Sequence, residues 1–210
     1  MILCFQIHLS CYNAFGETMP YPTAHPKVNE RARQVVGLNP IFLDTETTGV
    51  GLYDLVIEVG IVDLDGNLLY NSLINPGRPI PQDASKVHGI TDEMVADAPA
   101  LKDVWADIEA VLRDRAIGIY NAEFDYRLMK QSVDHAGVPW TIKKNQTFCM
   151  MNMFAAWYGE WNHRANNFRS QKLEFAGNFC GINLPNSHHA LDDAKLTAAL
   201  LRYLADYEKQ

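Results

Sequence analysis

Paired cysteines, long apolar runs and signal-peptide features are all missing from this chain. Its four cysteines, at positions 4, 11, 149 and 180, form no Cys-x-x-Cys pair, which disfavours a Cys/His zinc site. We interpret them as reduced, mostly buried thiols and expect a cytoplasmic protein. No apolar run approaches the roughly 18 residues of a membrane helix. The apolar N-terminus lacks the charged lead and the clear cleavage site of a signal peptide.

An excess of basic residues is also missing. The 210 residues include 18 Lys and Arg against 25 Asp and Glu, a net charge of −7. Proteins that coat nucleic acid without sequence preference are usually basic, so this class is disfavoured. An enzyme that holds a few phosphates through bound cations is not excluded. The length and the 48% hydrophobic fraction fit one globular domain with a short appendage.

Internal repeats are absent, and the chain divides into two parts. Residues 1–38 contain several prolines and a polar helical fragment near 29–36, and we interpret them as an N-terminal extension of unknown role.

Residues 39–210 show regular periodicity. Strands are predicted at 40–46, 55–64 and 68–74, the last two joined by an Asp-Gly turn. The elements predicted after this hairpin are a helix start at 91–94, helices at 101–112 and 122–136, strands at 117–120 and 147–149, a helix through Trp157, and a final helix around 191–201. Three antiparallel strands followed by alternating helices and strands predict an α/β fold with a mixed sheet flanked by helices.

Two carboxylates, Asp44 and Glu46, lie at the end of the first predicted strand. Side chains alternate along a strand, so both point to the same face. Neighbouring carboxylates repel each other unless a cation lies between them. Their hard oxygen ligands suit Mg²⁺ or Mn²⁺. The alternative is a pair of solvated acids at a sheet edge.

Two further motifs follow at domain-scale spacing. One is Asn-x-x-Phe-Asp at 121–125, after a short apolar run, and the other is His-x-Ala-x-x-Asp at 188–193. With the acid pair, these motifs resemble the DEDDh exonucleases, the proofreading-subunit family that also contains RNase T and oligoribonuclease. The resemblance covers roughly residues 41–206. It implies a ribonuclease H-like fold and a 3′-to-5′ exonuclease that releases nucleoside monophosphates.

The resemblance also implies a metal site. The family pattern assigns two Mg²⁺ or Mn²⁺ ions to four carboxylates, here Asp44, Glu46, Asp125 and Asp193. Two divalent cations roughly 3.5–4 Å apart can generate the attacking hydroxide, neutralise the phosphate and stabilise the leaving oxygen. Asp192 is the alternative to Asp193, but the family register favours Asp193.

A general base is expected at His188, because imidazole titrates near neutrality. The neighbouring His189 is the alternative. On a regular helix of 3.6 residues per turn, His188 would lie about 140° away from Asp193. His188 can therefore reach the site only from the loop before the final helix. The family register also favours His188.

Contacts to the substrate are expected near these motifs. Thr47, Thr48 and Gly49 form either an ordinary turn or a loop that approaches the 3′-terminal nucleotide, with Gly49 permitting close backbone contact. Asn121 is a helix N-cap or a nucleotide ligand, and capping is favoured. Phe124 is a core residue or stacks on a base, and the core is favoured. The segment at 87–91 resembles a recurring family loop near the substrate.

Aromatic and basic residues interleave between Trp157 and Lys172. This composition fits a platform for a single strand, where bases stack and cations meet phosphates. The alternative is a packed excursion whose aromatic residues fill the core, and the family does not decide between them.

Single-stranded DNA, or the 3′ end of duplex DNA, is favoured over RNA as the partner, and an RNA-trimming exonuclease is the main alternative. Less favoured are a non-catalytic domain that binds nucleic-acid ends and a glycosidase that uses paired acids. We see no counterpart of the tail with which the proofreading subunit docks on its polymerase, so we expect a free-standing repair or trimming enzyme. Several relatives are dimers, and the sequence leaves open whether this chain forms a homodimer. No membrane partner is expected.

Overall fold

A five-stranded sheet forms the centre of the computed structural model, which describes residues 26–207. The strand order is β3-β2-β1-β4-β5. The strands are β1 (Ile41–Thr47), β2 (Val56–Asp63), β3 (Leu68–Leu73), β4 (Ile117–Ile119) and β5 (Thr147–Cys149). β1, β2 and β3 are antiparallel, whereas β4 and β5 run parallel to β1. The prediction of an α/β fold with a mixed sheet is confirmed.

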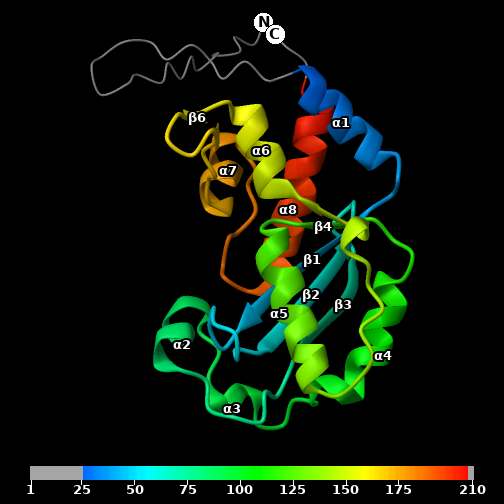
Figure 1. Ribbon diagram of the computed structural model, residues 1–210, viewed down its shortest axis with the longest axis vertical. Coiled ribbons are helices and arrows are strands. Elements are labelled where there is room, and N and C mark those ends of the chain that lie inside the picture. The colour runs from blue at the N-terminus through cyan, green and yellow to red at the C-terminus, as the bar shows by residue number, and fades with distance from the viewer. Residues whose placement is uncertain (1–25, 208–210) are drawn as a thin grey trace, which may run out of the picture.

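Helices cover both faces of the sheet (Figure 1). They are α1 (Pro26–Val36), α2 (Gln82–His88), α3 (Asp92–Val95), α4 (Leu101–Leu112), α5 (Ala122–His135), α6 (Met150–Tyr158), α7 (Leu173–Phe179) and α8 (Ala190–Asp206), with a 3₁₀ turn at Lys144–Gln146. One core cluster joins β1 and β2 to α8, α1, α6 and α7, and a second joins the opposite face to α4 and α5. Among the described residues, no helix is both long and apolar enough to cross a membrane.

The alternation of β1 explains how one strand serves both faces. Phe42 lies in the core cluster of α8, whereas Ile41 and Leu43 lie in the cluster of α4 and α5. Since side chains alternate, Asp44 and Glu46 continue the row of Phe42. Thr45 continues the row that faces α5. The end of β1 therefore presents polar groups to both helical layers.

Helix α1 packs on the main domain through α8. The Asn29 side chain donates a hydrogen bond of 2.6 Å to the carbonyl of Leu204. Ala32 and Val35 are buried in the core cluster of α8. The latter part of the proposed extension is thus integrated into the core, while residues 1–25 lie outside the described residues. The boundary at residue 38 stays a prediction.

Three short elements escaped the sequence analysis. They are α2, α7 and a hairpin of β6 (Trp161–Asn162) and β7 (Asn167–Phe168). The hairpin strands have two residues each, too few for a period-2 pattern. Helix α2 buries only His88, so it has no apolar stripe. Cys149 and Cys180 are unpaired, as expected. Cys4 and Cys11 lie outside the described residues.

Candidate active site

The two acids at the end of β1 lie beside a third acid on β2. Asp44 pairs with Gly60, and Glu46 pairs with Glu58. Asp44 and Glu46 are half-buried, and Glu58 is buried. β1 therefore places both predicted metal ligands on the sheet face that α8 covers.

Asp125 reaches the same end of the sheet from the first turn of α5. Its side chain is buried, and its Oδ1 accepts a hydrogen bond of 2.9 Å from the Thr45 hydroxyl. Thr45 lies between the two strand acids, so this bond fixes Asp125 beside them. Asp125 on α5 thus joins Asp44 and Glu46 on β1 in one cluster of acids.

Asp193 comes from the first turn of α8 and is also buried. Its Oδ1 has no hydrogen-bond partner among the described residues. Candidate ligand atoms of Glu46, His188 and Asp193 all lie within 4.8 Å of one another. A buried carboxylate oxygen without a partner is costly, and a cation would satisfy it. The donor set of carboxylate oxygens and one imidazole suits a divalent metal ion.

The acids of this cluster oppose one another electrostatically. Burial, followed by the charges of Asp125, Asp193 and other acids, raises the pKa of Asp44 well above its ordinary value. Burial and the charge of Asp193 raise the pKa of Glu46 to about 8. Burial raises the pKa of Asp125 to about 7 and that of Asp193 to about 6, although His188 acts to lower the latter. Carboxyl groups that resist ionisation together are the setting in which a bound cation stabilises the charged form.

His188 lies in the loop before α8, as its role requires. Its φ of 54° is left-handed, which turns the chain so that the imidazole comes near Glu46 and Asp193. His189 is the N-cap residue of α8, and its Nδ1 lies 3.5 Å from Glu58 Oε2. The structure brings His188, and not His189, into the group of candidate ligands.

Glu58 is a residue that sequence reasoning missed. Its Oε2 accepts a hydrogen bond of 3.0 Å from the Ala190 backbone amide, at the start of α8. With the nearby His189, this contact ties β2 to the loop that carries His188. The available signal was a single acid inside the apolar run 56–62, which is unusual for a strand buried on both faces.

Gly60 permits this close approach. A Cβ at position 60 would lie 2.4 Å from the backbone carbon of Ala190 and 2.4 Å from the nitrogen of Leu191. Only glycine leaves room for the first turn of α8 against β2. The position of Asp193 therefore depends on the absence of a side chain at Gly60 of β2.

The predicted substrate loop uses its hydroxyl groups internally. The Thr47 hydroxyl donates to the carbonyl of Gly49 at 2.7 Å, and the Thr48 hydroxyl donates to Asp54 at 2.8 Å. A Cβ on Gly49 would lie 2.7 Å from the Asp54 carboxylate. Arg127 of α5 donates to the carbonyls of residues 50 and 51. The loop is thus held beside the cluster, and its contact with the substrate stays a prediction.

Two other predicted contacts lie at the start of α5. Asn121 is the N-cap residue, but its side chain makes no capping hydrogen bond, so the favoured capping interpretation is wrong in that respect. It is exposed and lines a pocket with Lys144. Phe124 is half-buried against the core cluster of α5, with the Arg127 guanidinium 5.7 Å from its ring centre.

His88, in the family-like loop, lies close to the same site. It is buried, its Nδ1 accepts a hydrogen bond from the Ile90 amide, and its Nε2 makes no hydrogen bond among the described residues. Burial lowers its pKa, while the Thr47 carbonyl and Glu58 act in the opposite direction. The buried His88 imidazole therefore lies near Thr47 of β1 and Glu58 of β2.

Residues 41–201 match the family model RNase_T, which is described as an exonuclease. The chain belongs to this exonuclease family. It is accordingly a 3′-to-5′ exonuclease, a hydrolase that acts on nucleic acid. The recognition of a DEDDh-like exonuclease from three motifs is confirmed.

Curated relatives agree with this assignment. The chain is 32% identical over 184 residues to an uncharacterized exonuclease, CP81, of Escherichia phage 186, covering 85% of this chain and 94% of the phage protein. It is 38% identical over 112 residues to DNA polymerase III subunit epsilon of Pasteurella multocida, covering 49% of this chain and 42% of that subunit. It spans 12% of a PolC-type DNA polymerase III from Thermotoga maritima, at 30% identity.

Solved structures share the fold. Exonuclease X in complex with 5′ overhanging duplex DNA superposes with a TM-score of 0.56 at 25% identity, covering 78% of this chain and 89% of that one. A 3′-exonuclease solved in recognition of a histone mRNA stem-loop gives a TM-score of 0.64 at 14% identity, covering 80% and 64%.

Proposed function

We propose that this enzyme is a metal-dependent exonuclease that removes nucleoside monophosphates from the 3′ end of single-stranded DNA, or of duplex DNA, by a two-metal mechanism. The observation that carries the proposal is the convergence of acids from β1, α5 and α8, with one buried oxygen of Asp193 left without a hydrogen-bond partner among residues 26–207. An acid cluster of this kind serves no purpose in stability, because each member raises the cost of ionising the others.

Asp44, Glu46, Asp125 and Asp193 would hold two Mg²⁺ or Mn²⁺ ions. When bound, such ions neutralise charge on the scissile phosphate and lower the pKa of a coordinated water. The carboxylates contribute oxygen donors from three separate elements, so the site forms only when the sheet, α5 and α8 are packed together.

His188 would accept the proton of the attacking water as the bond between phosphorus and the 3′ oxygen of the penultimate nucleotide breaks. Its exposure in the loop before α8 leaves the imidazole open to water. The contacts of Glu58 with Ala190 and of His189 with Glu58 position that loop. His188 is therefore the proposed base, and His189 a positioning residue.

DNA is favoured over RNA by the named relatives. Exonuclease X was solved with duplex DNA, and DNA polymerase III subunit epsilon is a polymerase subunit. The alternative is an RNA-trimming exonuclease, and a 3′-exonuclease solved in recognition of a histone mRNA stem-loop is among the structural neighbours. That likeness shows the fold alone, so DNA is the first choice.

The test is digestion of 5′-labelled single-stranded DNA and RNA of matched sequence, with Mg²⁺, Mn²⁺ or EDTA. We expect a ladder that shortens from the 3′ end, runs faster on DNA and stops in EDTA. Faster digestion of RNA than of DNA would make RNA the substrate in place of DNA. Digestion that persists in EDTA would overturn the metal mechanism.

A further inference from the structure

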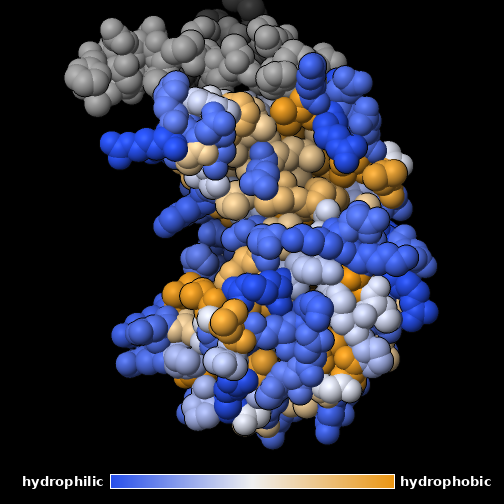
Figure 2. Space-filling model, viewed as in Figure 1, coloured by the Kyte–Doolittle hydropathy of each residue, from blue (hydrophilic) through white to orange (hydrophobic). Residues whose placement is uncertain are grey.

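A groove beside the active site remains unexplained by the proposed function. Two pockets form it, one of about 450 Å³ between α1, α6 and β7, and one of about 340 Å³ between the start of α5, β5 and α6. Cys149 and Asn152 line both pockets, so the two are neighbours on the surface. Figure 2 shows an apolar patch over α6 and toward α1, with hydrophilic residues around it.

One end of this groove lies at the start of α5, the helix that carries Asp125. Asn121 and Ala122 line the smaller pocket. Ala122 precedes the proposed metal ligand Asp125 by three residues on α5, about 4.5 Å along a helix. The groove therefore begins on the turn of α5 that carries a proposed metal ligand, and a strand with its 3′ end at the acid cluster would enter it there.

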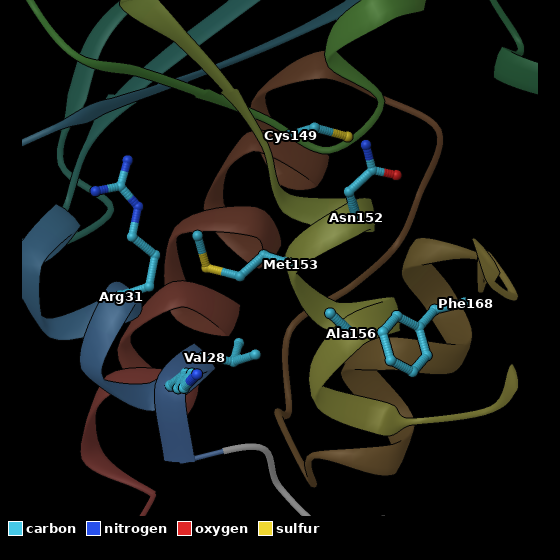
Figure 3. A pocket seen from close by; sticks show the side chains of 8 residues that line it. Val28, Arg31, Cys149, Asn152, Met153, Ala156 and Phe168 are labelled. Carbon is cyan, nitrogen blue, oxygen red and sulfur yellow. The ribbon is translucent and has the colours of Figure 1, made fainter. Parts of the chain in front are cut away.

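The far end combines cations with apolar side chains. Arg31 and Phe168 lie on opposite sides of the larger pocket, with Met153 between them (Figure 3). Lys27 also lines it, and both basic residues are exposed. Neither forms an ion pair among those found in residues 26–207. Apolar floors with free cations on the rim suit stacked bases and a phosphate backbone.

The aromatic and basic segment 157–172 separates into two roles. Trp157 is 2% exposed and belongs to the core, as the packed interpretation held. Trp161 is 42% exposed and packs edge-to-face on Phe168 at 5.0 Å between ring centres. The hairpin thus holds Phe168 at the wall of the groove. The platform hypothesis is kept for this hairpin alone, where it stays a prediction.

From these observations we propose that the groove binds the single strand immediately upstream of the 3′-terminal nucleotide, with Lys27 and Arg31 on its phosphates and Phe168 against its bases. The proposal rests on the proposed function. Lys27 and Arg31 precede residues 41–201, which the family model covers, whereas the other residues of this surface that the proposal uses lie within that range.

The smaller pocket carries a negative charge that repels the phosphates of a bound strand. Glu123 lines it and pairs with Lys144 at 2.9 Å. The positive charge is therefore concentrated at Lys27 and Arg31, and Glu123 opposes a phosphate that passes. Glu123→Gln should tighten binding of a long oligonucleotide about threefold, because one repulsive charge is removed.

The experiment measures binding of fluorescein-labelled oligo(dT) of about 12 nucleotides in EDTA, where nothing is cleaved. The double variant Lys27→Glu/Arg31→Glu should weaken binding at least tenfold, and the slope of log K against log salt should fall by about 1.4, since about 0.7 counterion is released per phosphate on single strands. The matched control is Lys102→Glu/Arg113→Glu on α4, which lines neither pocket. Equal effects of the two double variants would overturn the proposal.

Activity separates this proposal from the proposed function. With Mg²⁺, the groove variant should keep kcat/KM on a dinucleotide, which is too short to reach Lys27 and Arg31 at the far end of the groove, and lose at least tenfold on the 12-mer. Equal losses on both substrates would contradict the groove while leaving the exonuclease intact. The other possible occupant of the groove is a second copy of this chain, and sedimentation tests for it. If the wild type is a dimer and the groove variant a monomer, the groove is an interface between copies and the proposal fails.

Discussion

Asp193 and Asp192 are adjacent acids with opposite surroundings. Asp193 Oδ1 is buried without a hydrogen-bond partner among the described residues, whereas Asp192 accepts a hydrogen bond of 2.8 Å from the Ser187 hydroxyl. Asp193→Ala should lower kcat at least about 1,000-fold, roughly 4 kcal/mol of transition-state stabilisation. Asp192→Ala is the matched control and should lower kcat less than about tenfold. Steady-state kinetics with Mg²⁺ measure both.

The melting temperature of each variant shows whether it folds. Asp193→Ala removes a repulsive charge, so its melting temperature in EDTA should equal or exceed that of the wild type. An active Asp193→Ala enzyme, or an inactive Asp192→Ala enzyme of unchanged stability, would show that Asp193 is wrongly assigned as the metal ligand.

The two neighbouring histidines give a second matched pair. His188→Ala should lower kcat about 100- to 10,000-fold, the usual contribution of a general base. His189→Ala should lower kcat less than about tenfold, because His189 acts only through Glu58. The reverse result would exchange their roles.

At the scale of elements, the contact between β2 and α8 decides where the site forms. Gly60→Ala would place a methyl group 2.4 Å from the backbone of Ala190. We expect a loss of about 2–4 kcal/mol in the free energy of unfolding, and a lower kcat because Asp193 and His188 move with the helix. Urea denaturation measures the first and kinetics the second.

Gly37→Ala is the control for this substitution. Gly37 follows α1, and a Cβ there would lie 3.3 Å from the Gln34 carbonyl. Its loss should stay within about 1 kcal/mol with unchanged kcat. A Gly60→Ala enzyme as stable and as active as Gly37→Ala would show that α8 does not need its close approach to β2.

Elements with strong local signals could be predicted from the sequence. The alternation of β1 placed Asp44 and Glu46 on one face, and the five-residue spacing of His188 and Asp193 required a loop that carries His188. Helix α2 could not be predicted, because it has no apolar stripe. Glu58 could not be assigned a role, because its partner at Ala190 is 132 residues away. The groove joins Lys27, Cys149 and Phe168, and no local pattern connects residues so far apart.

At the scale of the molecule, the acid cluster makes metal-free stability depend on pH. The Asp and Glu carboxyl groups of an unfolded chain have pKa values of about 4. Burial raises the folded pKa of Asp125 to about 7, and burial with the charge of Asp193 raises that of Glu46 to about 8. The folded protein therefore binds more protons than the unfolded chain between about pH 4 and 8, and this contribution to stability is lost as the pH rises through that window.

Thermal unfolding in EDTA checks this dependence. The melting temperature should fall as the pH rises from about 5.5 to 8, and Asp44→Asn should reduce the fall because one repulsive charge is gone. Added Mg²⁺ should reverse the fall at about pH 8, since a ligand that binds only the folded state stabilises it. A melting temperature that rises with pH in EDTA would contradict the proposed repulsion.

Titration of Mn²⁺ into the protein by calorimetry tests the central claim most directly, because it measures the metal site without reference to any substrate. We predict that the wild type binds two Mn²⁺ ions per chain in the presence of a nucleoside monophosphate. Asp193→Asn should bind fewer ions or bind them at least about tenfold more weakly, and Asp192→Asn should match the wild type. No Mn²⁺ binding to the folded wild type, or equal binding by Asp193→Asn, would contradict the assignment of this cluster as a metal centre.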